Sequence, residues 1–163
     1  MSGGIPTVVI QDKKIIGNKT AYDLMKDGVE EILVCDMDSI VTGRTNMKVY
    51  NDLAKFFEFI AFNLVYSIGE LVDSIVSGAS KVVISPDLSG QTLLSMREFS
   101  QNLVIPNSEM FQYFQKNGGK YAMTYGIEPQ VEFSLVYNIG PWISKKNYTN
   151  IDNFPAELRH FIR

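Results

Sequence analysis

Short apolar runs alternate with amphipathic stretches from residue 5 to about residue 127. The run Glu31–Met37 is continuous rather than alternating, as is typical of a parallel strand that is covered on both faces. Strands are predicted at 5–10, 31–37, 62–67, 80–85 and 102–106, and helices at 18–28, 46–60, 71–78, 93–99 and 108–119. Strand and helix succeed each other about every 25 residues, which predicts βαβ crossovers and a parallel sheet. An open doubly wound sheet and a (β/α) barrel both fit this pattern.

Helix ends carry recognisable signals. Thr20 with Asp23 has the spacing of a capping box, and Gly28 follows the same helix as its C-terminal stop. Asn107 is expected to cap the helix at 108–119. These signals set the boundaries of the predicted elements.

The pattern changes after residue 127. The stretch 128–163 is rich in Tyr, Phe and Asn and contains the only tryptophan, Trp142. A strand-like run at 120–127 precedes this stretch, and another at 131–139 lies within it. A short docking helix that begins at Pro155 is predicted at 155–163. We therefore expect a single α/β domain over residues 1–163, with βα units at about 5–127 and an irregular aromatic tail at 128–163 that could form an interface.

Charge and composition narrow the class of protein. The 163 residues carry a net charge of −3 without a basic stripe, so nucleic acid is not an expected partner. No apolar run reaches the ~18 residues of a membrane helix, so no membrane partner is expected. The first residues also lack the charged and apolar regions of a signal peptide. We expect a cytoplasmic protein.

The single cysteine and the single histidine limit the possible chemistry. With Cys35 as the only cysteine, an intrachain disulfide or a zinc–thiolate cluster is impossible, and Cys35 is interpreted as a small apolar residue within a strand. His160 lies three residues from the C-terminus, which excludes Ser-His-Asp and Cys-His schemes unless the tail folds back into a cleft. We expect no cofactor and no metal.

Asp36 and Asp38 are the candidate catalytic residues, because they follow directly on a buried apolar run. Backbone N–H groups of the following loop could instead satisfy both carboxylates. A third alternative joins them with Asp87 as oxygen ligands of Mg²⁺. The alternation within the strand and Pro86 before Asp87 argue against the metal.

Several segments resemble one enzyme family. The opening Ile5–Ile10 with the turn at 12–16, the stretch "DLMKDGVEEILVCDMDSIVTG", the helix after it, and "GELVDSIVSGASKVVIS" are similar, in order, to the first four units of the histidine-biosynthesis barrel isomerases and their cyclase relatives. The resemblance covers about residues 5–85. It implies a (β/α)8 barrel whose active site lies at the carboxyl ends of the strands, with Asp36 and Asp38 facing the barrel mouth.

Three departures argue against transferring the isomerase activity. Val9 stands where the family has a catalytic aspartate, and loss of a general acid or base typically removes ~10²–10⁴-fold of rate. Tyr66 and Ser67 replace the glycine cluster that would approach a substrate phosphate, and the loop with Ser85 and Asp87 adds a negative charge. The family's second catalytic aspartate belongs to the fifth strand. The nearest candidates for it in this sequence are Asn107 and Glu128, and neither clearly matches the family's position.

The length predicts a reduced barrel. A full barrel takes about 250 residues, so this chain is expected to hold only five to seven strands and to leave two unpaired edges. A homodimer could pair these edges, or the tail could fill the gap. The tail residues proposed for this purpose are Phe133, Leu135, Tyr137, Trp142 and Tyr148. We favour a homodimer to which the tail contributes.

Three functions remain open. The favoured one is a binding or assembly protein related to the isomerases but without their activity, with Tyr66, Ser67, Ser85 and Asp87 as candidate ligand-binding residues. The alternative is an enzyme, isomerase- or lyase-like, that acts on a small metabolite through a rebuilt acid/base site. A third is a paralogue that still binds a phosphorylated ligand. Its candidate cations are Lys13, Lys14, Arg44 and Lys81.

Overall fold

The computed structural model describes residues 4–17, 19–140 and 147–162. Its elements, in chain order, are β1 (Thr7–Gln11), β2 (Lys14–Ile16), α1 (Ala21–Lys26), β3 (Glu31–Asp36), α2 (Met37–Thr42), α3 (Met47–Ala54), β4 (Glu58–Val65), α4 (Ile68–Val76), β5 (Lys81–Ile84), α5 (Gly90–Phe99), β6 (Leu103–Pro106), α6 (Phe111–Lys116), β7 (Tyr121–Thr124), β8 (Leu135–Asn138), β9 (Tyr148–Asn150) and the 3₁₀ helix η1 (Ala156–Phe161).

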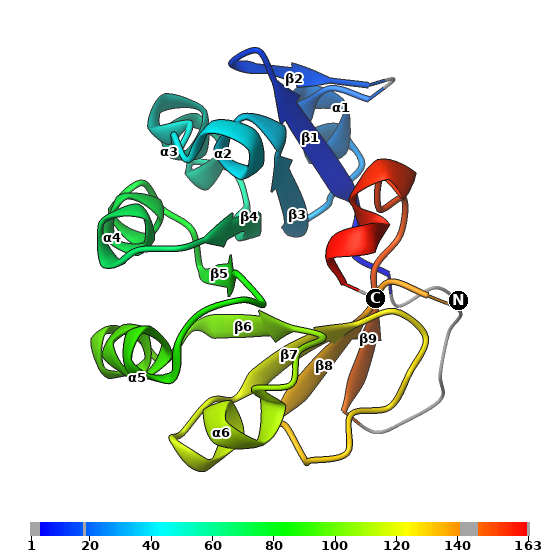
Figure 1. Cartoon of the computed structure of the whole chain (residues 1–163). Coiled ribbons are helices and arrows are strands. Elements are labelled where there is room, and N and C mark those ends of the chain that lie inside the picture. Colours follow the sequence, from blue (N-terminus) through cyan, green and yellow to red (C-terminus); the bar gives the residue numbers. More distant parts are fainter. Residues whose placement is uncertain (1–3, 18, 141–146, 163) are drawn as a thin grey trace.

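All described strands join one sheet of nine strands in the order β2-β1-β3-β4-β5-β6-β7-β8-β9. Each neighbouring pair from β1–β3 to β8–β9 is parallel, and β2 pairs with β1 as an antiparallel hairpin. The sheet curls, with the labelled helices on its outer side (Figure 1). The predicted α/β class with parallel βα units is confirmed, and the curl makes the fold barrel-like.

The two ends of the curled sheet are hydrogen-bonded to each other. Ile5 and Ile151 form a parallel bridge, in which the Ile5 N–H donates to the Asn150 carbonyl at 3.0 Å and the Asp152 N–H donates to the Ile5 carbonyl at 3.1 Å. The Thr7 hydroxyl adds a bond of 2.7 Å to the Asp152 carbonyl. The chain after β9 therefore supplies a partner for the chain before β1.

Two apolar clusters cover the two faces of the sheet. Along β3, Ile32 and Val34 belong to the cluster between sheet and helices, whereas Leu33 and Cys35 belong to the cluster inside the curl. All four side chains are fully buried. Burial on both faces explains why this strand reads as a continuous apolar run.

The residues that follow β9 fill one end of the curl. We call the end at which the parallel strands terminate the mouth, and residues 153–162 the C-terminal segment. Phe154, Leu158 and Ile162 of this segment are buried in the inner cluster, and the Phe154 ring meets the Phe62 ring edge-on at 5.0 Å. In Figure 1 this segment, in red, lies against the inner side of the sheet near β1 and β9. The predicted docking helix at 155–163 corresponds to η1.

Several predicted boundaries were wrong. The helix expected at 46–60 ends at Ala54, and the last residues of the prediction belong to β4, where Phe59 is buried on the helix side of the sheet and Ile60 on its inner side. Met110 rather than Asn107 precedes α6, without a side-chain cap. The capping box of Thr20 and Asp23 and the positive φ of Gly28 are confirmed.

The expected number of strands was also wrong. The described chain holds nine strands instead of five to seven, because most are only three to five residues long and their connections are short. Of the tail residues proposed to fill a gap, Leu135 and Tyr137 pack in the inner cluster, whereas Phe133 and Tyr148 pack on the helix side. Trp142 lies outside the described residues. None of the described helices is long and apolar enough to cross a bilayer.

Candidate functional site

Asp36 lies at the end of β3, and its side chain is directed into the layer between sheet and helices rather than toward the mouth. The side chain is fully buried and caps α2 by accepting the Ser39 N–H at 3.1 Å. It also accepts the Asn46 N–H at 3.2 Å, the Asn46 Nδ2 at 2.7 Å and the Tyr50 hydroxyl at 2.8 Å. Burial raises the pKa of the Asp36 carboxyl, although these donors oppose the shift.

The same carboxylate anchors a chain of buried polar groups. The Asn63 Nδ2 donates to the Tyr50 hydroxyl at 3.2 Å and to the Ser74 Oγ at 2.8 Å. Asp36, Tyr50, Asn63 and Ser74 are all fully buried, and they connect β3, α3, β4 and α4. Burial, with the Asp36 charge beside it, holds the pKa of Tyr50 well above its ordinary value. These hydrogen bonds tie two βα units together, and the buried Asn63 Oδ1 is left without a partner among the described residues.

Asp38 fixes the hairpin of β1 and β2. Its carboxylate accepts the backbone N–H groups of Asp12 at 3.0 Å and Lys13 at 2.9 Å, and the Asn46 Nδ2 at 3.0 Å. Both turn residues have positive φ, 54° and 64°, as a tight two-residue hairpin turn requires. The structure thus brings Asp36 and Asp38 together through Asn46, and both accept backbone N–H groups. Their predicted catalytic role stays a prediction.

Tyr66 and Ser67 lie at the N-terminus of α4. Ser67 is its N-cap and accepts the Glu70 N–H at 3.2 Å, while the Glu70 carboxylate accepts the Ser67 hydroxyl at 2.9 Å and the Tyr66 N–H at 3.1 Å. The Tyr66 side chain is 57% exposed. The Ser85 N–H donates to the carbonyl of Val65, the residue before Tyr66, at 3.0 Å, so the other two candidate ligand-binding residues, Ser85 and Asp87, follow the neighbouring strand.

Asp87 lines a pocket at the mouth. The pocket has a volume of about 650 Å³ and lies between the loop after β5, the loop after β6 and the end of η1. Asp87, Glu109 and His160 carry its titratable side chains, and Phe161 and Met110 contribute apolar surface. Ser85 is buried beneath the loop and accepts the Asp87 N–H on its Oγ at 3.2 Å. This pocket is where parallel α/β folds usually bind ligands, at the carboxyl ends of the strands.

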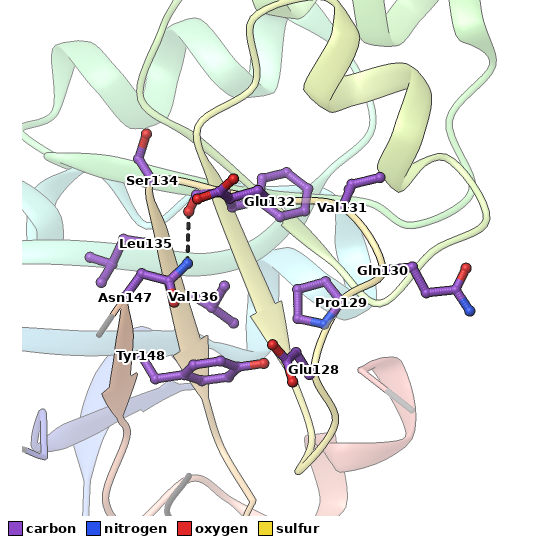
Figure 2. A pocket seen from close by; sticks show the side chains of 11 residues that line it. Glu128, Pro129, Gln130, Val131, Glu132, Ser134, Leu135, Val136, Asn147 and Tyr148 are labelled. Carbon is purple, nitrogen blue, oxygen red and sulfur yellow. Dashed lines mark hydrogen bonds between the residues drawn. The ribbon is translucent and has the colours of Figure 1, made fainter. Parts of the chain in front are cut away.

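A second pocket of about 650 Å³ lies under the β7–β8 connection, at the opposite ends of the strands (Figure 2). Glu128 and Glu132 come from the connection itself, and the Asn147 Nδ2 holds it through a bond of 2.8 Å to the Phe133 carbonyl. Partial burial and the nearby Glu128 raise the pKa of Tyr148, whose ring lies beside Glu128 in Figure 2. This second pocket lies at the start of β8 and β9, whereas parallel α/β folds usually bind ligands at the carboxyl ends of their strands. We therefore place the candidate site at the mouth.

The placement of the acidic residues in the described part of the chain bears on the Mg²⁺ alternative. Within the described ranges, no three His, Cys, Asp or Glu side chains are placed to hold one ion. The alternative in which Asp87 joins Asp36 and Asp38 around Mg²⁺ therefore finds no support in this part of the chain.

Sequence reasoning missed residues of two kinds. Asn63 could have been noticed, because it interrupts the otherwise apolar strand Phe59–Val65. His160 reaches the mouth because the tail does fold back into a cleft, and this depends on contacts far apart in sequence. Asn46 and Tyr50 gave no signal beyond their places on a predicted helix.

Comparison with known proteins adds no identification. No protein-family model matches the chain. No curated protein matches it either.

Proposed function

We propose that this chain is a small-molecule binding protein of the cytoplasm, a reduced relative of the histidine-biosynthesis (β/α)8 isomerases that lacks their activity. The observation that carries the proposal is the filling of the mouth. Phe154, Leu158 and Ile162 are buried at the strand ends where barrel enzymes of this kind hold their substrates. A phosphorylated sugar would have to displace these apolar side chains.

The candidate acid and base positions support the same proposal. Val9, at the family's first aspartate, packs against the inner cluster and has no group that transfers a proton. Asp36 is fully buried, and its two oxygens accept four hydrogen bonds from Ser39, Asn46 and Tyr50. A carboxylate held in this way is a structural anchor, because a substrate would have to replace protein donors.

The binding site of the proposal is the pocket at the mouth. Its volume of about 650 Å³ lies within the ~300–1,000 Å³ range of small-molecule sites. The side chains of Asp87 and Glu109 are exposed on its rim, and no hydrogen bond from either is seen among the described residues. These two groups are available to orient a ligand.

A thermal-shift screen of small metabolites tests the proposal. A ligand at a hundred times its Kd stabilises a protein by about 2.7 kcal/mol, which raises the Tm of a chain of this size by about 5–10 °C. Asp87→Asn and Glu109→Gln should reduce the shift, whereas Glu98→Gln, on the exposed face of α5, should not. A screen without any shift, or shifts that ignore the pocket variants, would argue against this function.

One observation favours the enzymatic alternative. His160, the only histidine of the chain, lines the same pocket as Asp87 and Glu109, and an imidazole there would supply the general acid or base that the alternative requires. If a ligand found in the screen is also converted, His160→Asn should abolish the conversion while leaving binding in place. Conversion that survives His160→Asn would exclude this residue as the acid or base.

The homodimer remains a proposal of the same kind. It was inferred from unpaired sheet edges, and the bridge between Ile5 and Ile151 joins the two sides of the sheet to each other within the chain. An assembly role would then use another surface. Light scattering after gel filtration, at several concentrations, decides between a mass of 18.4 kDa and twice that mass.

A further inference from the structure

The C-terminal segment is held at the mouth by side-chain packing. The hydrogen bonds described for residues 153–162 stay within the segment: Leu158 N–H to the Pro155 carbonyl at 3.1 Å and Ile162 N–H to the Arg159 carbonyl at 3.0 Å. Its helix is a single 3₁₀ stretch without a side-chain cap, a geometry with poorer hydrogen bonds than an α-helix. The buried Arg159 Nε finds no acceptor among the described residues. The segment can therefore leave without breaking any described hydrogen bond to the sheet.

The chain has a pivot where the segment begins. Asn153 adopts a left-handed conformation with a φ of 61°, directly after the bridge that anchors Ile151. Asparagine is one of the few residues that tolerate this conformation. Residues up to Asp152 are fixed by backbone bonds, whereas the described residues after Asn153 contact the rest of the chain through side-chain packing and the Arg159–Tyr125 contact.

The surface beneath the segment is apolar. Cys35, Phe62, Leu64 and Ile139 belong to the inner cluster that Phe154, Leu158 and Ile162 complete. Leu64 has a φ of 50° at an irregularity of β4 between Phe62 and Val65, and its side chain belongs to the inner cluster. Leucine rarely adopts a positive φ, and such conformations concentrate at ligand sites and switches.

We propose that the mouth beneath the C-terminal segment is a binding site for an apolar small molecule with an aromatic ring, and that Phe154, Leu158 and Ile162 occupy it as an internal ligand when no such molecule is bound. The inference rests on the proposed binding function and names a ligand class for the space beneath the segment, which adjoins the pocket lined by Asp87, Glu109 and His160. The molecule takes the place of the Phe154 ring against Phe62, and the segment swings out about Asn153. Its apparent affinity is reduced by the fraction of time that the segment is closed.

The charges around the mouth agree with this ligand class. Burial raises the pKa of the Cys35 thiol, and the nearby negative charges of Glu157 and Asp36 raise it further. Asp87 and Glu109 add negative charge at the rim. The cation of Arg159 lies 5.7 Å from the centre of the Tyr125 ring. The carboxylates of Asp87, Glu109 and Glu157 would repel an anionic ligand such as a phosphate, whereas they would not repel an uncharged apolar one.

Cys35 offers a native reporter of the opening. It is the only cysteine, it is fully buried, and it faces the inner cluster under the segment. We would measure the rate at which a disulfide reagent labels Cys35 in the full chain at increasing, non-denaturing urea concentrations. The proposal predicts a rate that depends little on urea, because only a local opening is needed. A rate that follows global unfolding at every urea concentration would overturn it.

The neutral fluorescent probe N-phenyl-1-naphthylamine tests the site itself. The proposal predicts that it binds, and that binding accelerates hydrogen exchange of the amides at 153–162 while leaving those of β3 and β4 protected. Binding without this acceleration would overturn the inference but leave the proposed function standing. Failure of the probe and of every ligand in the metabolite screen would overturn both.

Two matched variants sharpen the result. Leu158→Ala removes side-chain atoms from the segment, and Leu93→Ala removes the same atoms from the layer between sheet and helices. Leu158→Ala should raise both the labelling rate and the probe affinity roughly tenfold or more, because truncating a packed leucine shifts equilibria at least this far. Leu93→Ala should change neither by this factor. Equal effects of the two variants would show that only general stability is being measured.

Discussion

Tyr50→Phe removes one hydroxyl from the centre of the buried polar chain. The hydroxyl donates to Asp36 at 2.8 Å and accepts from Asn63 at 3.2 Å, and all three side chains are fully buried. The variant keeps the ring and its edge-on contact with Phe59, whose centre is 5.4 Å away. The change therefore isolates the hydrogen bonds from the packing.

The magnitude follows from the charge on the acceptor. A hydrogen bond to a charged group contributes about 1.5–3 kcal/mol, and without it Asp36 keeps only the donors from Ser39 and Asn46. We expect Tyr50→Phe to lower the free energy of unfolding by about 1.5–3 kcal/mol, or the Tm by about 3–12 °C for a chain of this size. In a double-mutant cycle with Asp36→Asn, the coupling energy should be about 0.5–3 kcal/mol.

Urea unfolding followed by circular dichroism measures both quantities. Tyr113→Phe is the matched control, because this ring is 38% exposed and its variant should change stability by less than about 0.5 kcal/mol. If Tyr50→Phe costs no more than Tyr113→Phe, or if the two changes in the cycle simply add, the buried chain does not stabilise the protein as we describe.

Two further predictions concern the neighbouring elements. The side-chain bond from Asn46, followed by the N–H groups of Lys13 and Asp12, lowers the pKa of Asp38 below its ordinary 3.8. This stabilisation is present in full above pH 3.8 and is lost as the pH falls through the lowered pKa. Asp38→Asn should therefore lower the free energy of unfolding in urea at pH 6, and the difference from the unchanged protein should shrink as the pH falls below 3.8. A difference independent of pH would contradict this. Gly78 has a φ of 112°, and an added Cβ would lie 2.5 Å from the Ala54 Cβ, whereas Gly17, with a φ of 117°, has open space there. Gly78→Ala should therefore cost about 1–3 kcal/mol more than Gly17→Ala, and equal costs would exclude the clash.

Local signals in the sequence located much of the sheet. The continuous run Glu31–Met37 predicted a strand covered on both faces, because such a strand has no solvent-facing positions to mark with polar residues, and β3 follows it to Asp36. The two-residue period of a strand also indicates where the Asp36 side chain points. Asp36 lies two and four residues after Val34 and Ile32, which face the helix side of the sheet. This spacing alone directs Asp36 away from the mouth, because side chains two residues apart on a strand point to the same face.

Elements that depend on distant partners were missed. β9 is only three residues long and exists through its pairing with β8 and the bridge that follows at Ile151. The run Phe56–Ile60 fits a helical and a strand pattern alike, and its pairing with β3 decided for the strand. The pocket that joins Asp87 with His160 depends on the fold of the tail, which no local pattern specifies.

An isomerase assay tests whether the chain has lost the activity of the family that it resembles. Purified full-length protein would be incubated with phosphoribosylformimino aminoimidazole carboxamide ribotide, the substrate of the family that the first half of the chain resembles, and product would be measured over hours. With Val9 in place of an aspartate and the mouth filled by Phe154, Leu158 and Ile162, we expect no product above the protein-free control. Turnover above that control, retained after further purification, would show that the mouth is an active site and would refute the proposed loss of isomerase activity.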